Sequence, residues 1–238
     1  MTDKTSTKPQ RRALGEWAVE TLYEQIFTGA LPVGADMAEE SLCERLDVSR
    51  ATVGLALRQL EQDGMLELAA GNGRRQVVAF STDDVGDLYD IRLALESFTA
   101  ERAASRISAA AIAQLQGLQD EMERLSRRPD RPTTRDFGID FDFHRVIARE
   151  SGSKRAVVAL QPVWNQTHAL LRHLYSVGVY ADAPEDAASY RDHREIISSL
   201  IDHDPDGARR AMAEHLSKRR ATLLAGLARQ AGTAMQDS

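Results

Sequence analysis

Four side chains of the types that bind divalent metal ions occur on helically patterned segments in the C-terminal two-thirds of the sequence. Asp140 and His144 are four residues apart in "GIDFDFHRVIA", so both project from one side of a helix. His193 lies on an apolar stripe in "YRDHREIISSL", and His215 follows Ala211 by one turn in "ARRAMAEHLSKRR". Carboxylate and neutral imidazole suit a divalent transition ion, and four protein ligands would leave coordination positions open.

A structural role is the alternative for each of these side chains. An inward-facing histidine is often a hydrogen-bonded core residue, and an Asp–His pair four residues apart can be a simple helix-surface pair. Spacing alone therefore leaves metal binding and core packing open. His168 shares a stripe with Trp164 and Leu171, so it either lines the same cavity or packs in the core.

The elements expected to position these residues are helices. After the linker "STDD", apolar residues recur at helical spacing, at Leu88, Ile91, Leu95 and Phe98 and then at Ile112, Leu115, Met122 and Leu125. "SRRPDRPTTRD" interrupts the pattern, and further helices are expected over 134–150, 154–178, 185–202 and 205–230. This patterning predicts an all-helical domain over 81–232, which carries the four candidate metal ligands, followed by a flexible tail at 233–238.

The N-terminal third has a different order of elements. Residues 13–28 carry a helical stripe of Leu14, Trp17, Ala18, Leu22 and Ile26, and further helices are expected over 39–46 and 49–63. "MLELAAGNGRRQVVAF" predicts two short strands around a Gly-Asn-Gly turn, the second being "QVVAF". This order predicts a winged helix-turn-helix over 12–80 after a flexible arm at 1–11. The expected fold class is therefore mainly α, with an all-α bundle following the winged domain.

The helix expected over 49–63 has the properties of a DNA-contacting helix. One of its faces lacks acidic residues, as a helix laid against phosphates requires. Two wing arginines could reach phosphate or the minor groove. The candidate DNA-binding residues are Ser49, Arg50, Thr52, Leu55, Arg58, Arg74 and Arg75. The net charge of the chain is −6, so the total charge does not favour binding to DNA. The positive potential that attracts DNA must therefore come from basic side chains that lie close together on one surface.

Composition limits the remaining classes of protein. The chain has 238 residues, of which 42% are hydrophobic, as in ordinary globular proteins. No apolar run approaches the roughly 18 residues of a membrane span, and the polar "MTDKTSTKPQRR" lacks a signal-peptide core. The single Cys43 rules out an internal disulfide and fits a reducing compartment. We expect a cytoplasmic protein with no membrane partner.

Several segments resemble a known family of regulators. "TLYEQIFTGALPVGADMAEESLCERLDVSRATVGLALRQLEQDGMLELAAGNGRRQVV" is similar to the winged helix-turn-helix of GntR-type transcription regulators. "DLYDIRLALESFTAERAA", "DFDFHRVIARESG" and "YRDHREIISSLIDHDPDGARRAMAEHL" resemble the helical effector domain of their FadR-type (FCD) subgroup. The resemblance covers about residues 12–230. It implies a ligand-responsive regulator, commonly a repressor, that binds double-stranded DNA at a palindromic operator as a homodimer.

The same resemblance implies a metal ion and an effector. The one Asp and three His that hold the metal in that subgroup fall here on Asp140, His144, His193 and His215. The divalent ion is expected to be Zn, with Mn or Ni as alternatives. A small organic acid would complete the coordination, and Arg92 is a candidate partner for its carboxylate. An Arg–Glu surface pair is the alternative for Arg92 and Glu96. The candidate effector-binding residues are Arg92, Glu96, Trp164 and His168.

One departure from the family pattern concerns the DNA-contacting helix. Where the family has Ser-Arg-Thr-Pro-Val-Arg-Glu-Ala-Leu, this chain has "SRATVGLAL", so Gly54 replaces the second arginine and Leu55 the glutamate. Either the operator differs from the family's usual one, or DNA binding has weakened; the surviving arginines favour an altered operator. Two other functions remain as alternatives. One is a metal-dependent enzyme with a vestigial DNA-binding segment, for which no general base or nucleophile motif is found, and the other is a regulator that senses the metal itself.

Overall fold

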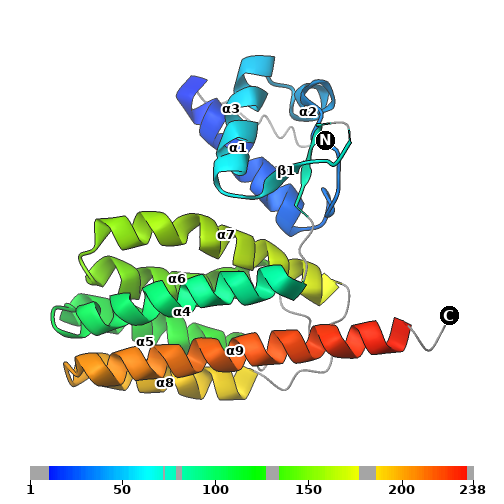
Figure 1. The fold of residues 1–238 in the computed structure, drawn as a ribbon. Coiled ribbons are helices and arrows are strands. Elements are labelled where there is room, and N and C mark those ends of the chain that lie inside the picture. The colour runs from blue at the N-terminus through cyan, green and yellow to red at the C-terminus, as the bar shows by residue number, and fades with distance from the viewer. Residues whose placement is uncertain (1–10, 72, 79–81, 127–133, 177–185, 235–238) are drawn as a thin grey trace, which may run out of the picture. The chain divides into compact units, whose positions relative to one another are not determined.

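The chain forms two compact units, residues 1–79 and 80–238 (Figure 1). The structure is a computed structural model that describes residues 11–71, 73–78, 82–126, 134–176 and 186–234. Within these ranges it contains nine helices and one two-stranded sheet. The mainly α fold class predicted from the sequence is therefore confirmed.

The N-terminal unit is a three-helix cluster with a small wing. It comprises α1 (Arg11–Phe27), α2 (Glu39–Leu46), α3 (Arg50–Gln62), β1 (Leu66–Leu68) and β2 (Arg75–Val77). Both α1 and α2 pack on α3, and the two strands are antiparallel, with Leu66 opposite Val77. The strand predicted over "QVVAF" thus begins one residue earlier, at Arg75, and ends at Val77. Residues 79 and 80 of that prediction lie outside the described residues.

The core of this unit follows the predicted periodicity except at one residue. Val53, Leu57 and Leu60 of α3 are completely buried, as their spacing predicts. Trp17 was expected on the inward stripe of α1, but 37% of its surface is exposed. The buried side of α1 is instead formed by small and aliphatic residues, namely Ala18, Leu22 and Ile26.

The C-terminal unit is a bundle of six described helices (Figure 1). They are α4 (Thr82–Ala104), α5 (Ala109–Ser126), α6 (Thr134–Glu150), α7 (Lys154–Ser176), α8 (Asp186–Ile201) and α9 (Pro205–Ala234). α4 contacts α6, α7, α8 and α9, so it lies at the centre of the packing. Pro205 opens α9, and Asp204 caps it by accepting a hydrogen bond from the Gly207 N–H at 3.0 Å.

The C-terminal end of α9 differs from the predicted boundary. The helix was expected to end near residue 230, with a flexible tail from 233, but it continues to Ala234. The last turns contain several alanine and leucine residues, which favour helix even where little packing supports it. Arg11, the last residue of the predicted arm, is the first residue of α1, so the predicted arm is at least one residue too long. The rest of the predicted arm and of the tail lie outside the described residues.

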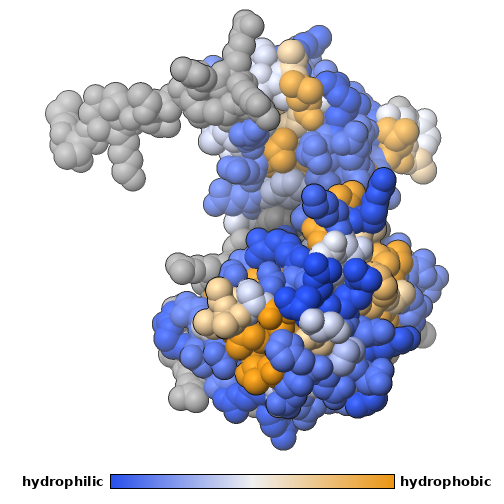
Figure 2. Space-filling view, turned by 90° about the vertical axis from the view of Figure 1, so that its left-hand side faces the viewer, coloured by the Kyte–Doolittle hydropathy of each residue, from blue (hydrophilic) through white to orange (hydrophobic). Residues whose placement is uncertain are grey.

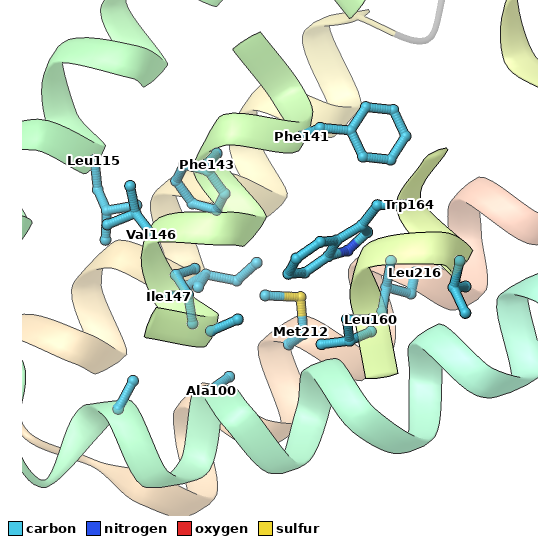
Figure 3. Packing of buried hydrophobic residues seen from close by; sticks show 14 of the residues in the cluster. Ala100, Leu115, Phe141, Phe143, Val146, Ile147, Leu160, Trp164, Met212 and Leu216 are labelled. Atoms are coloured by element: carbon cyan, nitrogen blue, oxygen red, sulfur yellow. The ribbon is translucent and has the colours of Figure 1, made fainter. Parts of the chain in front are cut away.

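Large apolar side chains fill the centre of the bundle. Figure 3 shows Phe141 and Phe143 leaving α6 in different directions and Trp164 projecting inward from α7. Ile91 and Phe98 of the predicted α4 stripe are 43% and 42% exposed, so their predicted inward orientation is wrong. α4 turns Arg92 and Glu96 toward the core in their place. The buried face of α4 is therefore the one that carries the Arg92–Glu96 pair, and not the one that carries Ile91 and Phe98.

The surface is predominantly polar. In the view of Figure 2, hydrophilic residues dominate and hydrophobic residues form only small, separate patches. In the part of the chain that is described, no helix has the length and apolar character needed to cross a membrane.

Candidate metal centre and nucleic-acid interface

The four residues singled out as metal ligands converge inside the bundle. Asp140 and His144 come from successive turns of α6, His193 from α8 and His215 from α9. One ligand atom of each lies within 4.8 Å of a ligand atom of every other. The three histidines are almost completely buried, and Asp140 is partly buried. Three helices that are distant in sequence thus bring one carboxylate and three imidazoles to a single point.

Distances within the cluster place the carboxylate between two imidazoles. Oδ1 of Asp140 lies 3.4 Å from Nε2 of His193, and Oδ2 lies 3.9 Å from Nε2 of His144. The ring of His215 lies 4.5 Å from that of His193 and 5.2 Å from that of His144, measured between ring centroids. The donor atoms therefore face a common small volume.

The hydrogen bonding of these imidazoles fits a metal site better than a structural one. Neither ring nitrogen of His193 has a hydrogen-bond partner among the described residues, and the same holds for Nε2 of His144. A buried polar atom without a partner costs about 1–3 kcal/mol, so such atoms are rare in a settled core. A divalent cation would bind one nitrogen of each imidazole and so give a partner to several of these buried atoms.

The protonation states in the cluster are those of metal ligands. Burial lowers the pKa of His193 from 6.5 to about 3, although the nearby Asp140 opposes the shift. Burial, together with the charges of His193 and His144, also lowers the pKa of His215. Burial raises the pKa of Asp140, but its electrostatic interactions with the nearby histidines and with Arg219 and Arg92 outweigh this effect and lower it. At neutral pH, His193 and His215 are thus neutral imidazoles and Asp140 is a carboxylate anion.

Arg92 and Glu96 form a buried ion pair next to this cluster. Nε of Arg92 donates to Oε1 of Glu96 at 2.6 Å, and the two side chains are 3% and 1% exposed. The surface pair considered as an alternative is therefore wrong, because α4 turns both residues into the core. Burial would raise the pKa of Glu96, but the charges of Arg92 and His144 and their hydrogen bonds lower it from 4.5 to about 2.

Trp164 and His168, the other two candidate effector residues, lie on α7 in different surroundings. Trp164 is buried and donates its Nε1–H to Oε1 of Glu96 at 3.0 Å. His168 is only partly buried, and its ring centroid lies 5.2 Å from that of Phe141. The structure thus joins Trp164 to the Arg92–Glu96 pair and places His168 against an aromatic ring.

Two neighbours of the ligand cluster were not identified from the sequence. Asp192 is 7% exposed, accepts a hydrogen bond from Nζ of Lys218 at 2.6 Å and has Oδ2 4.0 Å from Nδ1 of His215. Phe143 stacks on His193 with centroids 4.4 Å apart and an interplanar angle of 25°. The acidic residue directly before His193 was a visible signal for Asp192, whereas nothing in the spacing marked Phe143.

In the N-terminal unit, α3 presents most of the candidate DNA-binding residues to solvent. Oγ of Ser49 caps the helix by accepting from the Thr52 N–H at 3.3 Å. Arg50 and Arg58 are exposed, and Leu55 is 58% exposed although it is a large aliphatic residue. One face of α3 thus combines two cations with an apolar side chain that nothing in this unit buries.

The two candidate arginines of the wing form ion pairs within the unit. Nη1 of Arg74 lies 2.8 Å from Asp36, whereas Nε of Arg75 lies 2.7 Å from Glu61. Nη1 of Arg75 also lies 3.4 Å from Glu39 at the start of α2. Arg75 therefore connects the wing strand to both helices of the helix-turn-helix.

Gly54 is buried and does not lie open on the outer face of α3. A Cβ atom added there would lie 3.5 Å from Nη1 of Arg58 and 3.9 Å from Oε1 of Glu39, which are ordinary van der Waals distances. The glycine thus lies beneath the Arg58 guanidinium, and the backbone there has room for a methyl group.

Each of the two units matches a known protein family. Residues 14–75 match the family described as "Bacterial regulatory proteins, gntR family", and residues 87–218 match the FCD domain. The chain belongs to the FCD-containing GntR regulators. As a member of this family it is a transcription regulator, and its GntR helix-turn-helix is a DNA-binding domain.

Individual transcription regulators resemble the chain over most of their length. It is 27% identical over 215 residues to the "Probable D-xylose utilization operon transcriptional repressor" of Paenarthrobacter nicotinovorans, covering 90% of this chain and 91% of the relative. It is 28% identical over 232 residues to the "Exu regulon transcriptional regulator" of Escherichia coli K12, covering 88% and 83%. These relatives are regulators, which disfavours the enzyme alternative.

Solved structures show the same fold. The Escherichia coli protein McbR/YncC superimposes with a TM-score of 0.73 at 22% identity and covers 88% of this chain and 96% of its own. A GntR family member from Pseudomonas syringae pv. tomato gives a TM-score of 0.54 at 21% identity, covering 95% and 91%.

Proposed function

We propose that this GntR/FCD protein is a ligand-responsive repressor that acts in the cytoplasm as a homodimer on a palindromic operator. Its helical domain, residues 81–232, would bind a divalent metal ion and a small organic acid. The observation that carries this proposal is the convergence of Asp140, His144, His193 and His215, with buried imidazole nitrogens that lack hydrogen-bond partners in the described part of the chain. A stable core would normally satisfy such atoms.

In this proposal the four clustered residues hold the metal, with zinc as the expected ion and manganese or nickel as alternatives. Their donor set of three neutral nitrogens and one carboxylate suits these ions. When bound, the ion would supply positive charge and open coordination positions for an acid's carboxylate. The protein's part is to keep His193 and His215 neutral through burial and to hold Asp140 beside them as an anion.

Arg92 is the proposed partner for the effector carboxylate. Its guanidinium carbon lies 5.1 Å from the centre of the Tyr89 ring and 5.4 Å from that of Phe141, so two aromatic faces hold it in place. Glu96 fixes the guanidinium at Nε, and Trp164 in turn holds Glu96. His168 would complete the effector site from α7. A fixed, planar guanidinium suits bidentate pairing with a carboxylate.

For the DNA-binding domain, residues 12–80, we propose that α3 enters the major groove. Ser49, Arg50, Thr52, Leu55 and Arg58 would face the operator, and Arg74 and Arg75 would approach its backbone from the wing. The absence of an arginine at Gly54 removes a potential guanine contact, and the exposed Leu55 can contact a thymine methyl group. We therefore expect an operator that differs from the family's usual one.

Selection of bound fragments from the source genome by the purified protein tests the regulator proposal. The selection is run at a stated salt concentration, with zinc or with a chelator, and with and without a panel of small organic acids. Enrichment of one palindromic site that an acid releases supports a ligand-responsive repressor. Enrichment that depends on zinc alone would favour a metal sensor. No enrichment across a salt range would overturn the proposed operator binding.

A further inference from the structure

Glu96 is contacted by side chains from three helices. Oε1 accepts hydrogen bonds from Nε of Arg92 on α4, at 2.6 Å, and from Nε1 of Trp164 on α7, at 3.0 Å. Oε2 lies 2.6 Å from Nδ1 of His144 on α6. The two oxygens thus have different partners: one faces two obligatory donors, and the other faces an imidazole.

This division of partners determines which imidazole nitrogen carries the proton. Arg92 and Trp164 can only donate, so they hold Oε1 in place. An ionised carboxylate can only accept, so the 2.6 Å approach of Oε2 to Nδ1 of an imidazole with a single proton requires that proton on Nδ1. The lone pair is then on Nε2, the nitrogen that lies 3.9 Å from Asp140.

We propose that Glu96 is a positioning residue that fixes the tautomer and ring orientation of His144, so that Nε2 is presented to the metal. This inference rests on the proposed metal site and changes the expected role of Glu96 from effector contact to support of a metal ligand. Carboxylates that accept the second N–H of a metal-bound histidine are a common feature of metal sites, and their loss lowers metal affinity by about 10–100-fold. Because Arg92 holds the same carboxylate, the proposed effector residue and the metal ligand share one support.

The variant Glu96→Gln tests this role with almost no change in shape. Arg92 and Trp164 require an acceptor, so the amide oxygen of the glutamine would remain on their side. Its NH₂ group would then face Nδ1 of His144 and donate to it, which transfers the imidazole proton to Nε2. The variant should therefore invert the tautomer of His144 and block the nitrogen that would bind the metal.

Two further variants provide a control and a second test. Glu101→Gln removes a carboxylate from the same helix, where Glu101 pairs with Arg209 at 3.1 Å, and should leave the histidines unchanged. Trp164→Phe removes one donor to Glu96 but keeps an aromatic side chain. It should weaken the preference of His144 for the Nδ1–H tautomer without inverting it.

The tautomers are measured by long-range ¹H–¹⁵N NMR of the metal-free protein at neutral pH, and zinc affinity by competition with a chelating dye. We expect Nδ1–H at His144 in the wild type and in Glu101→Gln, and Nε2–H in Glu96→Gln, with zinc affinity lower by about 10–100-fold in the last. A wild type with Nε2–H, or a Glu96→Gln protein with unchanged tautomer and affinity, would overturn the inference.

The two readouts separate this inference from the metal proposal. If the wild type shows Nδ1–H but binds no zinc, the proposed metal site is wrong and the tautomer-fixing role of Glu96 stands. If Glu96→Gln does not fold, as judged by circular dichroism, the tautomer of His144 in the wild type and in Trp164→Phe tests the role of Glu96 instead. An unchanged tautomer preference and zinc affinity in the folded Trp164→Phe protein would then count against the role of the Glu96 network.

Discussion

Asp140 Oδ1 and His193 Nε2 lie 3.4 Å apart, and this contact connects α6 to α8 inside the bundle. Phe143 supports the histidine by stacking on its ring. Because the pKa of His193 is far below its ordinary value, the contact brings a carboxylate close to a neutral imidazole, and no ordinary salt bridge forms. A carboxylate and a buried imidazole nitrogen that lie close together without a hydrogen bond are the arrangement that a cation would stabilise.

The variant His193→Ala should lose metal and stability in the helical unit alone. It removes one of the four proposed ligands and the ring that stacks on Phe143. We expect bound zinc to fall well below one ion per chain. The stabilisation that zinc gives the wild type, about 2.7 kcal/mol at one hundred times the Kd, should largely disappear.

Metal analysis and tryptophan fluorescence check this expectation. The two tryptophans report on different units, because Trp164 is buried in the bundle and Trp17 lies on α1. Unfolding followed through Trp17, in a Trp164→Phe background, should be unchanged. A matched control is His203→Asn, which keeps a residue tolerant of φ = 50° at a histidine outside the cluster. Equal zinc content in His193→Ala and the wild type would remove His193 from the site.

Without metal, the stability of the helical unit should fall as the pH is lowered below about 6.5. The folded-state pKa of His193 is about 3, compared with 6.5 when unfolded, so the unfolded chain binds the extra proton between these values. Stability is therefore complete above pH 6.5 and is lost as the pH falls, by about 1.4 kcal/mol per pH unit for each such histidine. The lowered pKa of His215 acts in the same direction.

Urea unfolding with a chelator, at intervals from pH 7.5 to 5, measures this slope. The range stays above the ordinary pKa values of Asp140 and Glu96, so the carboxylates contribute little to it. In His193→Asn, the unfolding free energy should change less steeply with pH, because one proton fewer is taken up on unfolding. A wild-type unfolding free energy that does not change over this range would contradict the assignment of buried, neutral imidazoles.

Regular patterns in the sequence predicted most of the helices and the ligand set. Val53, Leu57 and Leu60 repeat at the helical period, so their burial could be read from their spacing. Asp140 and His144 are four residues apart, which identified them as a pair. The resemblance to regulators with an Asp and three His supplied the two distant members, His193 and His215.

Contacts between helices could not be predicted from the spacing of residues within each helix. The approach of Glu96 to His144 joins α4 to α6, and no periodicity within either helix encodes it. The i, i+4 spacing of Arg92 and Glu96 describes a buried pair and an exposed pair equally well. Trp17, Ile91 and Phe98 fit helical stripes, yet they are exposed because neighbouring residues already fill the inward side.

Replacing Arg50 with alanine should weaken specific binding to the operator strongly. Arg50 is exposed at the first turn of α3, where a guanidinium can reach a guanine. Loss of a bidentate contact costs about 1–3 kcal/mol, which is about a 5–150-fold weaker Kd for the operator. Fluorescence anisotropy with the selected operator measures the effect, and Arg155→Ala is the control because it removes an exposed arginine from α7. An unchanged footprint for Arg50→Ala would mean that α3 is not the reading helix.

Replacing Gly54 with alanine should stabilise the N-terminal unit. The added Cβ meets Arg58 and Glu39 only at van der Waals distances, and glycine weakens a helix by up to about 1 kcal/mol relative to alanine. Unfolding followed through Trp17, in a Trp164→Phe background, should show a gain of about 0.5–1 kcal/mol. Destabilisation would show that the space above Gly54 is needed in the folded unit.

Replacing Arg75 with alanine should affect the fold of the wing before it affects any phosphate contact. The guanidinium lies between Glu61 and Glu39, so its loss leaves two acidic side chains next to each other and releases β2 from the helices. We expect the N-terminal unit to lose about 0.5–1 kcal/mol of stability, as for a partly exposed ion pair. The double variant Arg75→Ala/Glu61→Gln should recover part of this loss, because it removes one of the opposing charges. Unchanged stability of Arg75→Ala would contradict this structural role. A phosphate contact in the DNA complex is tested separately, because its loss should decrease the salt dependence of operator binding by about one counterion.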